Sequence, residues 1–436
     1  MPRVLIVTSM FLPYLAADVH RARILARELP RIGWEVELLV PGDSFQLRDY
    51  FEPHSELLRV SVPIHRAEPQ WEWLFRLLGW RSLGWRAYRP LRSLGDSLLA
   101  GGRFDLVYFS CSQPTLLHLG VGWRARHGTP FVIDLHDPWY TPELPTPRHL
   151  SVWKRRVTNY ISKFTERATV ARAAGIVSVS VEYIETLNRR FAGEGWEALS
   201  PQCQATIPFA ASEEDVRAAE QLSLASPTAR AGSPAMVTVV YTGAGGTIME
   251  ESLREICRHL LAVKAGNPKL LAGVRIWLFG TEPSAPPGEA AVTRVVTEMG
   301  LSDLITEFPA RLSYLDALRH VVEADGLLIL GVDDPAYVPS KLFLYALSGK
   351  PLLACLRSGT TVDGYFASMP AMGRCIHFGS KGEAVEAMDQ DEVEGFLVEA
   401  SNRVSFDRRR ALDSHSAAHM AALHAELFES CLGKAR

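Results

Sequence analysis

Cysteine is scarce in this sequence, and long apolar runs are missing. Only six cysteines occur among 436 residues, and no two of them form a CxxC pair. This pattern predicts reduced, mostly buried thiols in a cytoplasmic protein. No apolar run approaches the roughly 20 residues of a membrane helix. The first residues, MPRVLIVTS, contain only a short apolar run with no cleavage site after it, so we expect a strand there and not a signal peptide.

An excess of basic residues is also missing. The formal net charge is −3, which argues against bulk nucleic-acid binding because such binding needs a basic face. There is no repeat at a fixed period and no low-complexity run. The chain is 47% hydrophobic and 22% charged, a balance that favours large cores over disorder. Its length suggests two or three domains.

Apolar strands alternate with amphipathic helices along the chain. We expect strands at residues 4–7, 36–40, 106–109, 131–134, 176–180 and 205–208, and a second series at 237–241, 274–279, 305–308, 326–330 and 352–354. Continuous apolar strands between helices indicate parallel sheets covered on both faces. The two series predict two Rossmann-like domains, whose binding sites lie outside the carboxyl ends of the strands. The first turn, TSMFLPYLAA, has no GxGxxG, which argues against a nicotinamide enzyme.

A segment rich in Ser, Ala and Pro, SLASPTARAGSP, separates the two series of strands. We therefore expect an N-terminal domain at residues 1–208, a linker at 209–235, a C-terminal domain at 236–408 and a terminal helix within 409–436.

Three glycines follow the first strand of the second series. Gly243, Gly245 and Gly246 lie in VVYTGAGGT, where glycines let backbone N–H groups approach a diphosphate closely. An ordinary strand-to-helix turn is the alternative interpretation. The three glycines are therefore candidates for binding a diphosphate.

The segment 339–351, PSKLFLYALSGKP, follows a buried-looking strand. Ser340 is a candidate helix cap, because its hydroxyl can accept from free N–H groups of the first turn. A helix start suits a phosphate, and Lys341 adds a mobile cation at the same place. Gly349 is expected to end the helix. A solvated lysine is the alternative for Lys341.

The segment 130–140, PFVIDLHDPWY, ends a predicted strand with polar and aromatic residues. Imidazole titrates near neutrality, so His136 can orient a hydroxyl or shuttle a proton. Asp137 is a candidate base or hydrogen-bonding ligand. Trp139 and Tyr140 offer flat apolar faces to a ring-shaped ligand. A loop histidine that caps local backbone is the alternative for His136.

The PSK segment and the HD pair resemble those of retaining GT-B glycosyltransferases of family four, many of which read roughly PSK-L-x-E-Y-x-A-x-G-K-P. The resemblance implies two facing Rossmann-like domains with a cleft between them, and a terminal helix that crosses back onto the first domain. It also implies transfer of a sugar from a UDP-, GDP- or TDP-sugar to an acceptor hydroxyl with retention, without a cofactor and without a metal. Arg311 occupies the place of a loop under the nucleotide base in such relatives, and it is a candidate for donor binding.

Two departures from the family pattern concern the donor. Leu344 replaces the Glu that holds the ribose in the family, and the loss of such a charge-assisted bond costs about 1.5–3 kcal/mol. Ala16 and Ala17 replace two glycines of the family's F-x-P-x-x-G-G-x-x-x-R segment. Another group then holds the ribose, the donor is unusual, or donor binding is weak or lost.

The same early segment carries two candidates for acceptor binding, Asp18 and His20. Helix capping is the alternative for Asp18. A further segment, residues 71–92, combines four tryptophans with five arginines. Aromatic and basic residues together suit contact with anionic lipid or with a lipid diphosphate acceptor. Helices that pack tryptophans inward with solvated arginines are the alternative.

The sequence thus favours a cytoplasmic glycosyltransferase, with peripheral contact at the inner membrane face through residues 71–92 as an extension. Its acceptor is a sugar, a lipid-linked molecule or a small molecule. Two alternatives stay open. One is a non-catalytic GT-B protein that assists another transferase, and the other is a sugar-nucleotide epimerase.

Overall fold

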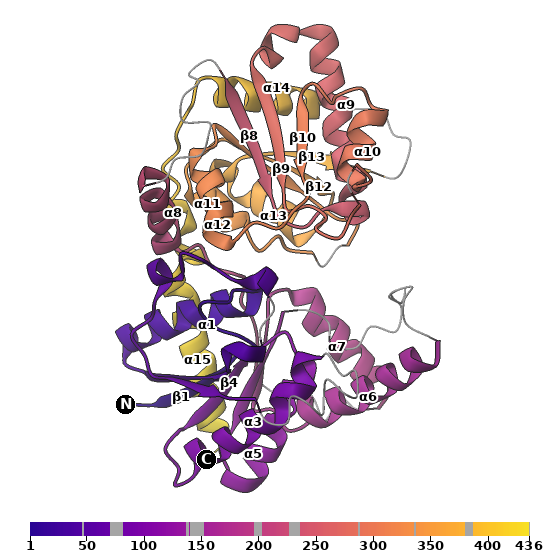
Figure 1. Cartoon of the computed structure of the whole chain (residues 1–436). Helices are drawn as coiled ribbons and strands as arrows, with labels where there is room; N and C mark the ends of the chain where they lie inside the picture. Colours follow the sequence, from indigo (N-terminus) through magenta and orange to yellow (C-terminus); the bar gives the residue numbers. More distant parts are fainter. Residues whose placement is uncertain are drawn as a thin grey trace. The chain divides into compact units, whose positions relative to one another are not determined.

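The computed structural model describes residues 1–45, 48–69, 82–136, 139, 152–195, 203–225, 236–286, 288–334, 337–379 and 387–435. The chain forms two compact units, the first of Met1–Phe209 with Ala417–Arg436 and the second of Ala210–Ser416. Each unit holds one parallel sheet with helices around it (Figure 1), which confirms the α/β class. Among the described helices, none is long and apolar enough to cross a membrane.

The sheet of the first unit has the strand order β3-β2-β1-β4-β5-β6-β7. Its strands are β1 (Arg3–Val7), β2 (Glu35–Pro41), β3 (Ile64–Ala67), β4 (Leu106–Ser110), β5 (Phe131–Leu135), β6 (Gly175–Ser178) and β7 (Cys203–Thr206). Its helices are α1 (Ala17–Glu28), α3 (Leu83–Leu99), α4 (Pro114–Leu117), α5 (Leu119–His127), α6 (Val152–Val170), α7 (Val181–Gly193) and α15 (Ala417–Ala435). β4 and β5 are buried along their whole length, as a parallel sheet covered on both faces requires.

The sheet of the second unit has the strand order β10-β9-β8-β11-β12-β13. Its strands are β8 (Val237–Thr242), β9 (Val274–Phe279), β10 (Ile305–Phe308), β11 (Gly326–Leu330), β12 (Leu352–Arg357) and β13 (Arg374–Phe378). Its helices are α8 (Glu213–Ala225), α9 (Glu250–Gly266), α10 (Ala291–Glu298), α11 (Tyr314–Glu323), α12 (Leu342–Leu347), α13 (Thr361–Ser368) and α14 (Ala387–Ser401).

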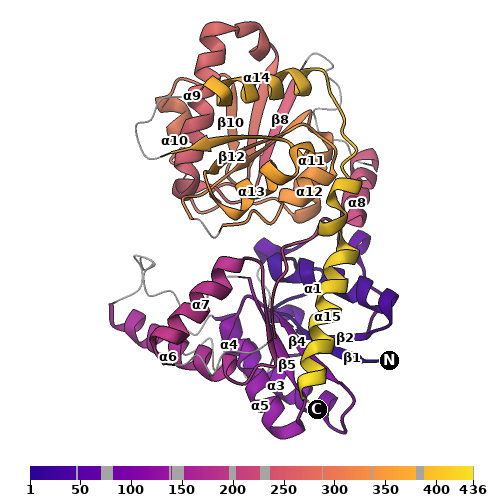
Figure 2. The same ribbon diagram turned by 180° about the vertical axis from the view of Figure 1, so that it is seen from behind.

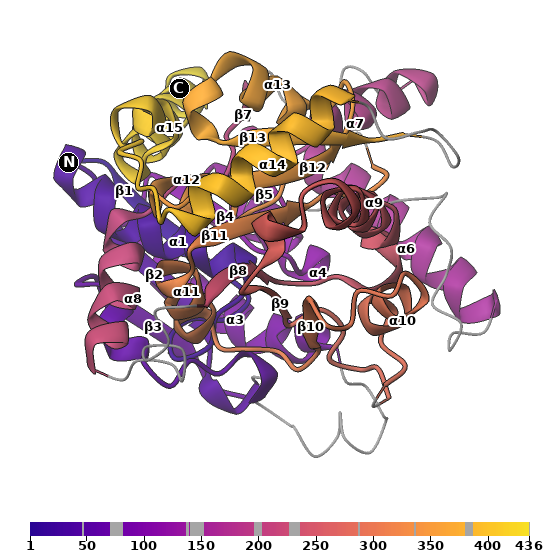
Figure 3. The same ribbon diagram turned by 90° about the horizontal axis from the view of Figure 1, so that it is seen from above.

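Alternate residues of the second sheet enter two different cores. Along β11, Leu328 and Leu330 pack with α9, α10 and α14, whereas Leu327 and Ile329 pack with α11, α12 and α13. Figure 3, which looks down on this unit, shows these helices around the twisted strands. Because successive side chains of a strand point to opposite faces, a wholly apolar strand feeds both layers.

Edge strands and helix caps differ from the sequence expectation. β3 (IHRA) and β13 (RCIHF) are missing from the predicted strands, because each lies at a sheet edge and carries polar residues that weaken the apolar signal. The strand predicted at 176–180 stops at Ser178. Ser180 caps α7 instead, since its side chain accepts from the backbone N–H of Glu182.

The expected linker, residues 209–235, also differs. Its first part forms α8, which packs against α11 and belongs to the second unit. Buried Ala218, Ala219 and Leu222 explain why this stretch folds as a helix on a core and does not act as a spacer. Residues 226–235, which hold most of the Ser- and Pro-rich segment, lie outside the described residues.

The terminal helix α15 packs against α1, β6 and β7 of the first unit. Figure 2 shows it running along this unit's sheet beside α1. Phe428 is fully buried, with its ring centroid 5.5 Å from that of Trp34 and 5.2 Å from that of Tyr108. Helix α15 is therefore an integral layer of the first unit.

A buried polar cluster anchors α15 to the sheet. The imidazole of His424 donates from Nδ1 to the Met420 carbonyl at 2.7 Å, which leaves Nε2 as an acceptor that faces Arg21 Nη1 at 3.4 Å. Tyr108 Oη lies 3.1 Å from the same Nε2. Burial lowers the pKa of His424 to about 3, and the Arg21 guanidinium adds to this effect. His424 is thus held as a neutral acceptor.

We expect the stability of the first unit to fall as the pH is lowered from about 6.5, because His424 protonates in the unfolded chain long before it can in the folded one. The slope from this residue approaches about 1.4 kcal/mol per pH unit. Replacing His424→Gln keeps an acceptor without a titrating ring, so melting temperatures between about pH 6.5 and pH 4.5 should fall less steeply. His419→Gln, at an exposed position of the same helix, should keep the wild-type slope. Equal slopes for both variants would contradict this role.

Candidate functional site

The loop after β8 contains the three glycines predicted to hold a donor. Gly243 and Gly246 adopt left-handed backbone angles, with φ of 130° and 69°. The N–H of Gly243 donates to the Phe279 carbonyl at 2.8 Å, and that of Gly245 donates to the Thr281 carbonyl at 2.8 Å. These two amides therefore join the loop to the end of β9, and they are not free to bind a diphosphate as the sequence analysis expected.

Gly243 instead makes room for Lys341. A Cβ atom at position 243 would collide with the Lys341 ammonium, so only glycine lets this ammonium lie against the end of β8. There Nζ donates to the Thr242 carbonyl and stands 4.6 Å from the centre of the Tyr241 ring. Among the described residues, no carboxylate lies within ion-pair distance of Lys341. Burial of the ammonium lowers its pKa to about 7.

Helix α12 is fastened to the same loop by Tyr345. The phenolic oxygen accepts from the Thr242 N–H at 2.9 Å and lies 2.8 Å from Thr242 Oγ1. Burial raises the pKa of Tyr345 to about 12, so this group is a neutral hydrogen-bonding partner. Leu344, the residue before Tyr345, has an apolar side chain that is only 7% exposed. Position 344 therefore offers no carboxylate to a ribose.

Ser340 does not cap α12. The helix begins at Leu342, Lys341 is the residue before it, and no side chain caps it. Ser340 is exposed in the preceding turn, where the Leu342 N–H donates to the Pro339 carbonyl. Because of this turn, the helix begins at Leu342, two residues after the predicted cap. Gly349 ends the helical segment in a left-handed conformation, with φ of 74°, as expected.

Arg311 lies close to the glycine loop through its backbone. A Cβ atom on Gly280, at the end of β9, would stand 3.9 Å from both Arg311 Cα and Gly243 N. The side chain of Arg311 is exposed. The structure thus brings together Gly243, Lys341 and the start of the Arg311 loop at the carboxyl edge of the second sheet.

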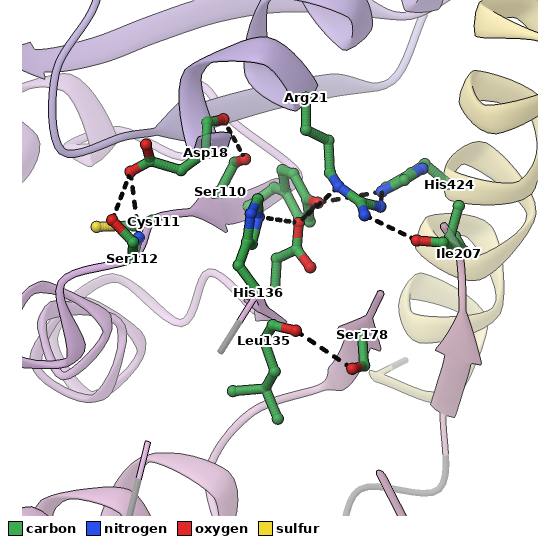
Figure 4. Close-up of polar contacts among 12 residues, drawn as sticks. Asp18, Arg21, Ser110, Cys111, Ser112, Leu135, His136, Ser178, Ile207 and His424 are labelled. Carbon is green, nitrogen blue, oxygen red and sulfur yellow. Dashed lines mark hydrogen bonds and ion pairs between the residues drawn. The ribbon is translucent and has the colours of Figure 1, made fainter. Parts of the chain in front are cut away.

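In the first unit, His136 follows β5 directly and is 7% exposed. Its Nε2 lies 2.7 Å from Asp134 Oδ2, and its ring centroid is 5.3 Å from that of Phe209. Figure 4 shows His136 and Arg21 approaching one carboxylate from two sides. Since the carboxylate accepts from Nε2–H, the lone pair of the imidazole is on Nδ1, which has no partner among the described residues.

Asp134 is the centre of this arrangement. Arg21 Nε stands 3.1 Å from Asp134 Oδ2, and the Tyr108 hydroxyl donates to the same oxygen at 2.7 Å. Burial opposes ionisation of Asp134, but the charge of Arg21 and the hydrogen bond from His136 outweigh it, and the pKa of Asp134 stays well below its usual range. Asp134 is therefore an anion that fixes the tautomer and the orientation of His136.

The other predicted acceptor residues have different surroundings. Asp18 is fully buried, and its carboxylate accepts from Ser9 Oγ and from the backbone and side chain of Ser112. It joins the ends of β1 and β4 and is occupied by protein donors (Figure 4). His20 is half-buried on α1. Trp139 packs against the core of the first unit.

Two predicted residues, Asp137 and Tyr140, lie outside the described residues. Four residues of the His136 arrangement were not site candidates, namely Arg21, Tyr108, Asp134 and His424. For two of them the sequence signal is a polar residue in an apolar pattern: Asp134 interrupts VIDL, and His424 stands four residues after Met420 on the apolar side of α15.

Comparisons with known proteins bear on the fold and on the N-terminal domain. Residues 19–195 match the glycosyl transferase 4-like domain. HepE of Anabaena, solved in complex with UDP-glucose, is 15% identical, with 99% of this chain and 100% of HepE covered and a TM-score of 0.55. A trehalose 6-phosphate synthase from Burkholderia multivorans is 11% identical, with both chains fully covered and a TM-score of 0.61.

A glycosyltransferase from Rickettsia africae is 12% identical over 99% of both chains, with a TM-score of 0.57. No curated protein matches the chain. At these identities the solved structures establish the fold alone, and they confirm the expected two-domain α/β architecture. Residues 19–195 form a glycosyl transferase 4-like domain, which agrees with the expected sugar-transfer activity.

Proposed function

We propose that the second unit binds the diphosphate of a UDP-sugar through Lys341, and that the sugar passes to an acceptor hydroxyl with retention. The buried ammonium of Lys341, which has no carboxylate partner among the described residues, carries the proposal. An uncompensated buried cation is costly, and an anionic ligand relieves that cost. UDP is our choice of nucleotide because HepE, which has the same fold, was solved with UDP-glucose; GDP and TDP are the competing choices.

The bond changes of the proposed transfer are simple. The bond between the anomeric carbon and the diphosphate oxygen breaks, and the acceptor oxygen bonds to the same carbon from the same face. Lys341 stabilises the negative charge that develops on the leaving diphosphate. The acceptor hydroxyl donates a hydrogen bond to His136 Nδ1, which takes the proton as the new bond forms and passes it to the leaving diphosphate.

On the acceptor side, the proposal includes contact of residues 71–92 with an anionic lipid surface or a lipid-linked acceptor at the cytoplasmic membrane face. Residues 71–81 lie outside the described residues. In the described part, α3 packs Ala87 and Leu91 inward and leaves Trp85 47% exposed. All six cysteines are free, which fits a reducing compartment.

Replacing Lys341→Ala should weaken UDP binding at least about tenfold, because it removes the cation that faces the diphosphate. A thermal-shift panel of UDP, GDP, TDP and their common sugars measures this, since a ligand that binds the folded state raises the melting temperature. Lys350→Ala, in the same PSK segment, is the matched control. Unchanged affinity in Lys341→Ala would overturn the phosphate placement, and no shift with any nucleotide would favour a non-catalytic role.

The affinity for UDP-glucose should fall as the pH rises above about 7, because Lys341 loses its proton there in the empty site. The decline approaches about tenfold per pH unit until the donor no longer favours the charged form. Isothermal titration between about pH 6 and pH 8.5 measures it. Lys341→Arg stays charged throughout this range, so its affinity should be flat with pH. A wild-type affinity that does not vary with pH would contradict the assignment.

Replacing His136→Ala should lower kcat by about 10²–10⁴ and leave the affinity for UDP-glucose unchanged. The affinity is unchanged because His136 is proposed to contact the acceptor hydroxyl and not the donor. Release of UDP, with water as the default acceptor, measures turnover. His118→Ala is the control, because His118 is a half-buried histidine of the same unit that bonds to Thr169. Equal turnover of both variants would exclude the proposed role of His136.

A further inference from the structure

A cluster of three chemically different side chains lies at the β13 edge of the second sheet. Cys375 and His377 are two residues apart on β13, so they share one face of the strand. Asp363 comes from the first turn of α13. None of the three contributes to the Lys341 site or to the cluster around Asp134.

The three ligand atoms converge. His377 Nε2 is 2.8 Å from Asp363 Oδ1 and 3.9 Å from Cys375 Sγ, and all three atoms lie within 4.8 Å of one another. A tetrahedral zinc ion with bonds of about 2.0–2.3 Å sets its nitrogen and oxygen ligands about 3.4 Å apart and its nitrogen and sulfur ligands about 3.5 Å apart. The two spacings from His377 differ from these values by about 0.6 Å and 0.4 Å, so modest rotations of the side chains complete the tetrahedral geometry.

Neighbouring groups hold two of the three residues in position. The second carboxylate oxygen of Asp363 accepts from the Gly359 N–H at 2.9 Å, which leaves Oδ1 directed at His377. The backbone N–H of His377 donates to Asp389 of α14 at 3.0 Å. Partners of this kind orient ligands at metal sites. The side chains of His377 and Asp363 are 35% and 25% exposed, so an ion reaches the cluster from solvent.

We propose that Asp363, Cys375 and His377 bind one zinc ion. Thiolate sulfur, imidazole nitrogen and carboxylate oxygen are the ligands that zinc takes in proteins, whereas calcium and magnesium take oxygen. On binding, the Cys375 thiol releases its proton to solvent, and the imidazole of His377 keeps its proton on Nδ1 while Nε2 binds the ion. The reaction of the glycosyltransferase does not pass through this ion.

The same three side chains also resemble a nucleophilic cysteine with a His–Asp pair, but the surrounding charges disfavour that function. Burial raises the pKa of the Cys375 thiol, and the carboxylates of Asp363, Asp389 and Glu392 raise it further. A cysteine nucleophile needs the opposite. These carboxylates attract a divalent cation instead. Arg374, on the same strand, is paired with Glu392 and Glu399.

The test uses the full chain, freed of metal with a chelator and then titrated with Zn²⁺ against a chromophoric chelator. We expect one zinc ion per chain and one proton released per ion bound. With Co²⁺ in place of zinc, the bound form should show a thiolate-to-cobalt charge-transfer band, which reports Cys375 directly. Cys375→Ser should remove that band, and both Cys375→Ser and Asp363→Asn should weaken zinc binding at least about tenfold.

Cys355→Ala is the matched control. Cys355 is a buried cysteine of the neighbouring strand β12, where it pairs with Ile376, and it lies outside the ligand cluster. Its variant should keep wild-type affinity and the cobalt band. The proposal is overturned if the chain binds no zinc, or if Cys375→Ser and Asp363→Asn bind it as the wild type does while circular dichroism shows both folded.

Discussion

The ionised carboxylate of Asp134 is the group around which the first unit is built. Removing such an anion from water costs several kcal/mol unless hydrogen bonds and an opposite charge replace the water. Three elements supply these partners: Arg21 from α1, Tyr108 from β4 and His136 after β5. The same guanidinium donates to the Ile207 carbonyl at 2.7 Å. The geometry at His136 is therefore set by the whole layer structure of the unit and not by its own loop.

In the second unit, the buried ammonium of Lys341 differs from Asp134 because it has no partner of opposite charge among the described residues. Lys341 is surrounded by a carbonyl and an aromatic ring. A carboxylate there would stabilise the empty protein and compete with an anionic ligand for the ammonium. In the proposed function, leaving the cation uncompensated keeps its interaction energy for the anionic donor. The paired charges around Asp134 stabilise the fold, whereas the unpaired charge of Lys341 is proposed to serve binding.

The sequence predicted most strands and the class of fold, because buried parallel strands are continuously apolar and stand out from amphipathic helices. It also placed His136 at a strand end and Lys341 at the start of a helix. It did not predict that Gly243 accommodates the Lys341 ammonium while two loop amides bond to the end of β9. The Lys341 ammonium donates to the Thr242 carbonyl, 99 positions away, and the amide bonds join the ends of two different strands. The bond between Arg21 and His424 spans 403 positions. The local sequence pattern contains no information on such distant pairs. The start of α12 was also mispredicted, because Ser340 lies in a turn before the helix and does not cap it.

The first unit contains both ends of the chain, whereas the second unit is one uninterrupted segment. During synthesis, all of the second unit is made before α15 leaves the ribosome. Until then Arg21, Tyr108 and Trp34 have only part of their surroundings, because His424 and Phe428 are the last partners to arrive. The nascent chain thus passes through a stage in which one unit is complete and the other holds a water-exposed ion pair. Loss of the final helix by proteolysis or premature termination would return the protein to that stage.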